Sequence, residues 1–553
     1  MPLLFLSSTT SRAFLSYRGH LRTMALIHTF TTANTSRCTL GTELSASSVS
    51  LAETSASYAQ VIQKLQQITH LQQAKSVLTY DQLVFMPKEA SAQRGAHLSA
   101  IASIIHEKAT AIELRDLIDQ AILDATNSHD RDAKTLLQME RKTLTEQERI
   151  PTPLAAHMAS LGASAYSQWV ECKETNDFDA FAPTLQECFD TSIEVASKKR
   201  GDKTHSLYTQ MLDEFERGMS QQRMDDIFQE IQDALVPFIA RVLASDTQPS
   251  TDPLKGTFDI PTQKEFCQNI VNRLGYNLSQ GRIDVSVHPC TISLSPQDVR
   301  ITSRFRTDEW YQGLAATMHE AGHAMYEQSL GDSSTNLDTA LSMGTHESQS
   351  LFWERHVGLS REFWDWATPA LCATYPEEFA TTSAENLYGA VNAVLPSLIR
   401  VEADELTYPL HVLLRYNIEK AVIAGELAVK DIPARWNADM KSMLNVDVPD
   451  DANGCLQDVH WSALAFGYFP TYLIGSATAA QLAYYCEQDI GMASKVKRGE
   501  FNEIKEWLTE KVHRHGRRYE SLDALLEGQL GERLNPKYFI QYLTGKYSSL
   551  YNL

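Results

Sequence analysis

The chain has 553 residues, of which 43% are hydrophobic and 21% are charged, as in an ordinary globular protein. No uninterrupted apolar run reaches roughly 18 residues, so the sequence does not support a membrane span. The formal net charge of −20 disfavours a nucleic-acid partner, because phosphate binding requires a positive surface.

The first 42 residues contain four arginines but no aspartate or glutamate, and Glu43 is the first acid. This composition is typical of a transit peptide. We interpret residues 1–55 as a leader that directs import into a mitochondrion or plastid, and residues 56–553 as the folded part. The alternative is a disordered tail, or a message that also starts at Met24, with the protein in the cytoplasm.

From Tyr58 onward, apolar residues recur three and four positions apart, which predicts one helix after another. Examples are helices over residues 58–78, 90–125, 130–148 and 224–243. Residues 282–288 and 299–305 instead alternate apolar with polar side chains, so each is predicted to be a half-buried strand. We expect one large, mainly α-helical domain with a small antiparallel sheet.

The eight cysteines are scattered along the chain without a CxxC pair. Such spacing suits neither a cysteine zinc site nor a disulfide framework. We therefore expect free, mostly packed thiols in a reducing compartment.

The helix predicted just after the two strands carries the most informative motif. His319 and His323 are four residues apart, so both imidazoles lie on one helical face, with Glu320 beside the first. This HExxH arrangement can bind a divalent metal ion and place a carboxylate near the attacking water, which indicates a hydrolytic reaction. The alternative is an exposed helix whose histidines are merely solvated.

The surroundings of the motif favour a true metal site. Thr307 is a plausible N-cap of the helix, and Gly331 is a plausible stop. An apolar stripe at three- and four-residue spacing predicts that the two histidines border the buried side. The residues of that stripe are Leu314, Met318, Ala321 and Met325.

A catalytic metal site of this kind needs a third protein ligand from another element. Glu347 follows His323 by 24 positions, in a helix that we expect to start with Thr345 as N-cap and to run to residue 366. His346 and Glu354 are rival candidates. The extended HExxHxxGxxH pattern is absent, because residues 326 and 329 are Tyr and Ser.

Several ordered motifs resemble those of the carboxypeptidase Taq type of metallocarboxypeptidase, peptidase family M32. The resemblance spans residue 58 to the C-terminus. The motifs are DVRIT at 298–302, HEAGH at 319–323, HESQ at 346–349, IRVEAD at 399–404, GCLQDVHW at 454–461 and GYFPTY at 467–472. Two departures stand out: the family's HPF is His288-Pro289-Cys290 here, and the tryptophan of its WDQ is Tyr80. The cysteine puts the side-chain preference in doubt, and the tyrosine is expected to be a packing exchange.

The resemblance implies a helical gluzincin-type domain with a deep groove, commonly found as a homodimer. It implies that His319, His323 and Glu347 bind one metal ion and that Glu320 is the general base. Zinc is the expected metal and cobalt the alternative, since imidazole and carboxylate suit both. The implied activity is broad removal of C-terminal residues from peptides, with proline disfavoured.

An exopeptidase of this class also needs a donor for the oxyanion and a cation for the terminal carboxylate. Candidate donors are His460, Tyr468 and Tyr472, any of which could instead be a hydrogen-bonded core residue.

Three arginines and one histidine complete the candidate substrate-binding residues, which are Arg400, Arg300, Arg415 and His288. Arg400 is favoured as the cation, the alternative being a structural pair with Asp404. Arg300 could equally form a salt bridge with Asp298 that pins the sheet.

Two other functions remain open from the sequence. A helical metallo-oligopeptidase that cuts inside short peptides shares the same motif, and a non-catalytic helical binding protein could keep it without the chemistry. An aminopeptidase is disfavoured, because no GxMEN-type acidic segment is present.

Overall fold

A computed structural model describes residues 50–201, 203–331 and 335–553 of the chain. Within these ranges the fold is predominantly helical with one three-stranded sheet, so the predicted fold class is confirmed. The leader assigned to residues 1–55 lies largely outside the described residues. Its last part does not, because Leu51 is buried and its N–H donates to Asp130 Oδ2 over 3.1 Å.

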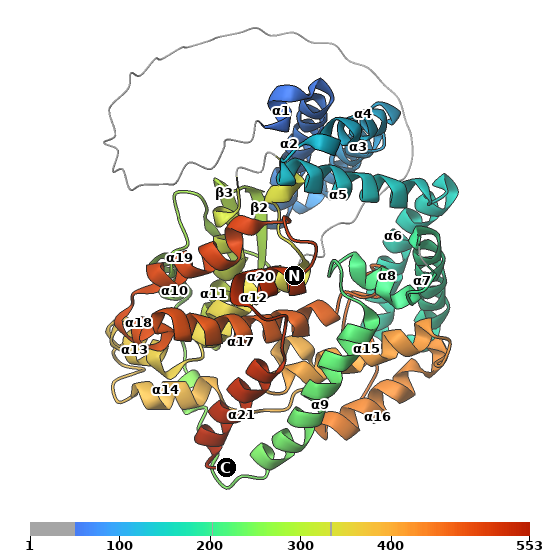
Figure 1. Cartoon of the computed structure of the whole chain (residues 1–553). Coiled ribbons are helices and arrows are strands. Elements are labelled where there is room, and N and C mark those ends of the chain that lie inside the picture. Colours follow the sequence, from blue (N-terminus) through green and yellow to red (C-terminus); the bar gives the residue numbers. More distant parts are fainter. Residues whose placement is uncertain (1–49, 202, 332–334) are drawn as a thin grey trace, which may run out of the picture.

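The first helices form a layer with a small core of their own, drawn at the top of Figure 1. They are α1 (Leu51–Thr54), α2 (Ala56–Val84), α3 (Ser91–Ala109), α4 (Ile112–Asp124) and α5 (Arg131–Glu148). The single helix predicted over residues 90–125 is therefore wrong. The chain breaks at Thr110 and Ala111, where the backbone of Ala111 is extended and starts α4 in a new direction.

The middle of the chain contains the HExxH helix and the elements that precede and follow it. They are α6 (Thr152–Thr175), α7 (Phe178–Lys199), α8 (Leu207–Asp213), α9 (Gln221–Leu243), α10 (Ile260–Leu274), β1 (Ile283–Val285), β2 (Cys290–Ser295), β3 (Asp298–Ser303), α11 (Trp310–Ser329), α12 (Met343–Leu351), α13 (Arg361–Thr374) and α14 (Ala384–Val391).

The last part of the chain packs around these elements. It comprises α15 (Tyr408–Ile423), α16 (Ile432–Leu444), α17 (Pro470–Ile490), α18 (Met492–Arg498), α19 (Phe501–Lys511), α20 (Leu522–Leu530) and α21 (Lys537–Tyr551). Short 3-10 turns connect several elements, at Lys88–Ala90, Ala125–Asn127, Asp252–Leu254, Asn336–Asp338, Arg400–Glu402, Val429–Asp431 and His513–His515.

The predicted sheet lies beside α11, but its pairing is mixed. β1 and β3, the two predicted strands, pair in parallel, with Ile283 opposite Ile301. The antiparallel partner of β3 is β2, which the sequence prediction missed. A parallel pair needs a connection that crosses over, and here β2 and its turns supply that connection.

The helix that carries the HExxH motif starts later than predicted. α11 begins at Trp310 with Glu309 at its N-cap, so Thr307 does not cap it, and the Thr307 carbonyl accepts the N–H of Phe258 over 2.7 Å. Gly331 does not end the helix in a left-handed conformation either, because the C-cap residue is Leu330 and its backbone is extended. The predicted apolar stripe is confirmed: its four residues are at most 2% exposed.

The helix predicted from Thr345 to residue 366 is divided in two. The cap of α12 is Ser342, whose side chain accepts the N–H of Thr345 over 3.1 Å. A wide π-helical turn, η5 (Phe352–Val357), follows α12, and α13 starts only after Ser360. The wide turn brings Glu354 back toward α11, as described below.

Close helix contacts at glycines set the position of α12. A Cβ added to Gly322 on α11 would lie 2.5 Å from the Gln349 carbonyl oxygen, and one added to Gly475 on α17 would lie 2.7 Å from Glu347 Cβ. Only glycine allows backbones to approach so closely. Helix α12 is therefore clamped between α11 and α17, in the centre of Figure 1.

A buried carboxyl group holds the start of α12. Glu216 Oε2 accepts the Gly344 N–H over 2.9 Å, and its Oε1 has no hydrogen-bond partner. Burial raises the pKa of Glu216 to about 7. The group is therefore protonated at mildly acidic pH in the folded protein.

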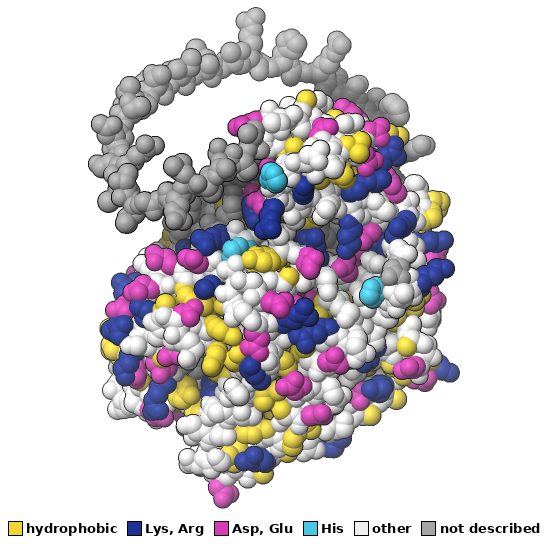
Figure 2. All heavy atoms as spheres, in the orientation of Figure 1, with side chains coloured by type: hydrophobic (Ala, Val, Ile, Leu, Met, Phe, Trp, Pro, Cys, Tyr) yellow, Lys and Arg dark blue, Asp and Glu magenta, His cyan; other side chains and the backbone are white. Residues whose placement is uncertain are grey.

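The predictions of no membrane-spanning helix and of free thiols agree with the structure. No helix of the described ranges combines the length and apolarity that a bilayer crossing requires. The seven cysteines in these ranges are free thiols, and most are buried. Figure 2 shows Lys and Arg interspersed with Asp and Glu over one face, rather than gathered into a basic surface.

Replacing Gly322 with alanine tests the clamp. The added methyl group would overpack the contact between α11 and α12, so we expect the free energy of unfolding to fall by about 1–3 kcal/mol. Urea unfolding of metal-free protein measures it. Gly545→Ala is the matched control, because nothing lies within 4 Å of its added Cβ, and equal stability of the two variants would contradict the clamp.

The raised pKa of Glu216 predicts a pH dependence of stability. Between its ordinary value of 4.5 and about 7, the folded state binds a proton that the unfolded chain has released, so stability falls as pH rises through this window. Glu216→Gln cannot ionise, so its unfolding free energy should fall less between pH 5 and 8 than that of the original protein. Parallel curves for the two proteins would exclude this role.

Candidate functional site

Three side chains from two helices converge beside the sheet. His319 and His323 project from α11, and Glu347 projects from α12. Glu347 Oε2 lies 3.9 Å from His319 Nε2 and 3.5 Å from His323 Nε2. Within the described residues they are the one group of three or more His, Cys, Asp or Glu whose ligand atoms all lie within 4.8 Å of one another.

The other nitrogen of each imidazole has a partner that fixes the ring. His319 Nδ1 lies 2.7 Å from Glu354 Oε2, so this nitrogen carries the proton and Nε2 keeps its lone pair for a ligand. Such outer partners are what orient metal-binding histidines. Glu354, a rival third ligand in the sequence, thus contacts the far side of His319.

A longer chain of contacts supports His323. Its Nδ1 lies 2.6 Å from His346 Nδ1, and His346 Nε2 lies 2.9 Å from Glu327 Oε1. With Glu327 accepting from His346 Nε2, His346 Nδ1 can accept from His323 Nδ1, which leaves His323 Nε2 free to bind a cation. His346, the other rival ligand, therefore contacts Nδ1 of His323 and leaves Nε2 of His323 to face the triad.

The charges of the site favour a cation between these side chains. Burial lowers the pKa of His319, but Glu347, Glu354 and Glu320 outweigh it and raise that pKa to about 9. Burial and the neighbouring His346 lower the pKa of His323 to about 4. Without a metal ion, a proton on His319 therefore supplies the positive charge. Two imidazole nitrogens and a carboxylate with these supports fit a divalent transition-metal ion, which would displace that proton.

Glu320 is buried beside the triad and is held by the strand that the sequence prediction missed. Thr291 Oγ1, on β2, lies 2.6 Å from Glu320 Oε2 and 3.0 Å from the Glu320 carbonyl oxygen. The carboxylate of the HExxH motif therefore has a fixed orientation next to His319.

The favoured arginine, Arg400, lies in a buried cluster of charged groups on a short 3-10 turn. Its Nη2 donates to Asp458 Oδ1 over 2.9 Å, and its Nη1 donates to Tyr408 Oη over 3.3 Å. The alternative pair with Asp404 is absent, because Asp404 accepts backbone N–H groups of its own turn and of Leu395.

Arg415, fully buried on α15, shares the same acid. Its Nε donates to Asp458 Oδ2 over 2.5 Å. Two guanidinium groups thus face one carboxylate. Burial lowers the pKa of Arg415 to about 10, with a contribution from the charge of Arg400, although Asp458 opposes the shift.

The candidate oxyanion donors lie next to this cluster. His460 Nε2 is 3.2 Å from Tyr472 Oη, and the Arg400 guanidinium lies 4.7 Å from the centre of the Tyr472 ring. Burial lowers the pKa of His460 to about 3, so this ring is neutral. Burial, with a contribution from the charge of Glu347, raises the pKa of Tyr468 and Tyr472, so both hydroxyls stay protonated.

Two predicted residues lie in the sheet region instead. Arg300 binds Asp298 through two hydrogen bonds of 2.8 and 2.7 Å and stacks over the Tyr80 ring at 5.0 Å. The structural alternative for Arg300, a salt bridge within the sheet, is therefore present. His288 has an exposed side chain in the turn between β1 and β2.

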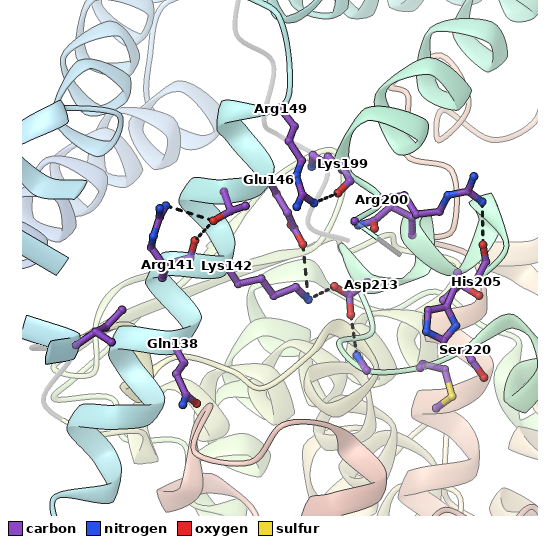
Figure 3. A pocket seen from close by; sticks show the side chains of 17 residues that line it. Gln138, Arg141, Lys142, Glu146, Arg149, Lys199, Arg200, His205, Asp213 and Ser220 are labelled. Carbon is purple, nitrogen blue, oxygen red and sulfur yellow. Dashed lines mark hydrogen bonds and ion pairs between the residues drawn. The ribbon is translucent and has the colours of Figure 1, made fainter. Parts of the chain in front are cut away.

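A cavity of about 630 Å³ lies elsewhere, between α5, the end of α7 and α8. Figure 3 shows that much of its polar lining is already paired, for example Lys142 with Asp213 and Glu146. None of the predicted site residues lines it. The groove implied by the family resemblance is a separate feature and stays a prediction.

Sequence reasoning missed Glu327 and Thr291, although signals for both were present. Glu327 is four residues after His323, on the same helical face. Residues 290–295 alternate polar and apolar side chains, which is the strand signal that would have identified β2 and Thr291.

Comparisons with known proteins agree with the geometry. The family model described as carboxypeptidase Taq (M32) metallopeptidase matches residues 60–547. Carboxypeptidase 1 of Bacillus subtilis is 37% identical over 492 residues, which cover 88% of this chain and 97% of that protein. Thermostable carboxypeptidase 1 of Thermus thermophilus is 33% identical, with 90% and 99% covered. The structure of an M32 carboxypeptidase from Deinococcus radiodurans has a TM-score of 0.86 at 34% identity, covering 90% of this chain and all of that one.

Removing the Glu354 carboxylate tests its support of His319. In Glu354→Ala the imidazole loses its acceptor, so we expect metal affinity to fall about 10- to 100-fold with one ion still bound at saturation. Competition with a chelating dye measures the dissociation constant, and Glu426→Ala, at an exposed loop position, is the control. Unchanged affinity would exclude this support, and loss of stoichiometric binding would make Glu354 a ligand.

Proposed function

Because this chain belongs to the carboxypeptidase Taq (M32) family of metallopeptidases, we propose that it removes C-terminal residues from peptides, with His319, His323 and Glu347 as metal ligands and Glu320 as general base. The protein is a metallocarboxypeptidase, and the resemblance in the sequence motifs is confirmed. The observation that carries the proposal is the convergence of the three ligand atoms beside Glu320.

The catalytic roles follow from the chemistry of the side chains. A divalent ion, when bound, supplies a Lewis acid that polarises the scissile carbonyl and acidifies the attacking water. Glu320 accepts the proton of that water and delivers it to the departing amine. Tyr468 and Tyr472 keep their protons and are candidate donors to the oxyanion, with His460 orienting Tyr472.

The cluster around Arg400 suits the terminal carboxylate of the substrate. Arg400 and Arg415 carry two positive charges, whereas Asp458 carries one negative charge, so the buried cluster has one positive charge in excess. A substrate carboxylate would balance it, with Arg400 as its partner. Arg300 and His288, which lie in the sheet region, are proposed only as more distant substrate contacts.

The finer properties are proposals that rest on the family. They are zinc as the metal, with cobalt as the alternative, a broad preference for C-terminal residues other than proline, and a homodimeric assembly. The arginine-rich, acid-free leader supports import into a mitochondrion or plastid, with the cytoplasm as the alternative.

Product analysis by mass spectrometry tests the function. Incubation with an unblocked peptide is expected to give a ladder shortened one residue at a time from the C-terminus. A chelator should abolish the ladder, and added zinc or cobalt should restore it. The same peptide with an amidated C-terminus is the control, and it should be shortened far more slowly because it lacks the carboxylate for the Arg400 cluster.

Other products would indicate a different function. Internal fragments of equal yield from both peptides would indicate a metallo-oligopeptidase. The alternative of a non-catalytic binding protein is not favoured, because the named relatives are carboxypeptidases.

Glu320→Gln isolates the general base. The amide keeps the size of the side chain but cannot take a proton, so we expect kcat to fall by orders of magnitude while metal content stays at one ion per chain. Metal analysis and steady-state kinetics of the same preparation measure both. Substantial turnover by the metal-loaded variant would refute the assigned role.

A further inference from the structure

We propose that Thr291 is a positioning residue for the reaction, which holds one oxygen of the Glu320 carboxylate so that the other faces the attacking water. The inference rests on the proposed role of Glu320 and goes beyond it, because it assigns a task to strand β2. The observation is the 2.6 Å contact between Thr291 Oγ1 and Glu320 Oε2.

A hydroxyl group has one proton to donate, and two acceptors lie within reach of Thr291. The Glu320 carbonyl oxygen is 3.0 Å away, and the carboxylate oxygen is 2.6 Å away. The shorter contact to the charged group is the stronger one, so the proton points at Oε2.

The register of β2 on α11 explains why Thr291 lies there. Residues 291 and 293 point to one face of the strand, and Glu320 and Glu327 are two helical turns apart on one face of α11. Thr291 contacts Glu320. Burial raises the pKa of Glu327, but His346 and, to a smaller extent, a hydrogen bond from Ser293 outweigh it and lower that pKa. Strand β2 therefore runs along α11, with the hydroxyl of Thr291 next to Glu320 and that of Ser293 next to Glu327.

The neighbouring strand fixes this register from a second point. Ser303 Oγ on β3 is 2.9 Å from Thr317 Oγ1 on α11, one turn before Glu320. Thr291 itself lies opposite Ile301, which is fully buried. Because the sheet is anchored on both sides of the motif, the hydroxyl cannot move away from the carboxylate without shifting β3.

This contact makes the two oxygens of Glu320 different. Oε2 is occupied by the Thr291 hydroxyl, so the lone pairs of Oε1 remain for the proton of the attacking water. The carboxylate then accepts and returns the proton from one fixed position. Without the hydroxyl, rotation about the last side-chain bond would spread the carboxylate over orientations that do not face the water.

The test compares Thr291→Val, which has nearly the same shape, with Thr291→Ser, which restores the hydroxyl. For Thr291→Val we expect kcat to fall about 10- to 100-fold, with KM changed less than about threefold and metal content unchanged. Thr291→Ser should recover most of kcat. Ser295→Ala, at the far end of the same strand, is the control and should match the original protein.

A structural measurement accompanies the kinetics. In a crystal structure of metal-loaded Thr291→Val, the Glu320 carboxylate should be rotated or disordered relative to the original protein, while the triad keeps its geometry. If Thr291→Val does not fold, Thr291→Ala provides the same comparison with Thr291→Ser.

Two results would overturn the inference: unchanged kcat in both hydroxyl-free variants, or a loss in Thr291→Ser as large as in Thr291→Val. A loss of metal from Thr291→Val would also contradict it, because the effect would then be structural. Failure of the original protein to release C-terminal residues would instead refute the proposed function, so the two failures are distinguishable.

Discussion

The approach of α12 to α11 determines whether this protein can bind a metal ion. An HExxH helix alone supplies two imidazoles, which leave a metal ion weakly held, and the third ligand comes from a helix that must pack almost backbone to backbone against the first. Gly322 lies between the two histidines and admits that approach, whereas Gly475 gives the Glu347 side chain its space from the opposite side. The glycine inside the motif is therefore part of the metal site, although it supplies no ligand atom.

The proposed site contains two clusters of charged side chains. Acids gather near the imidazoles, where Glu347, Glu354 and Glu320 together keep a proton on His319 in the absence of a metal ion. In the second cluster, Arg400 and Arg415 share Asp458. A cation and a substrate carboxylate would each neutralise one of these regions. Buried charges that await a partner reduce the stability of a protein, which is the expected cost of a preorganised site.

The three side chains that converge in the structure were readable from the sequence, because a helical spacing of four residues and a few ordered motifs specify them locally. Spacing alone favoured Glu347 only slightly over His346 and Glu354, because the position of each side chain depends on how α12 and its wide π-helical turn fold back over α11. The sequence prediction also misplaced the ends of both helices. Thr307 and Thr345 have the chemistry of caps, but α11 begins after Glu309, and the nearby Ser342 caps α12 in place of Thr345. The sequence of β2 alternates polar and apolar residues, but we missed this strand because it lies between the two longer segments that we predicted as strands.

The most direct test of this account is anomalous diffraction from crystals of the metal-loaded protein, recorded on both sides of the absorption edge of the metal. The account predicts one ion per chain, bound by Nε2 of His319, Nε2 of His323 and the carboxylate of Glu347. An ion bound elsewhere, or bound with Glu354 or His346 in place of Glu347, would contradict it.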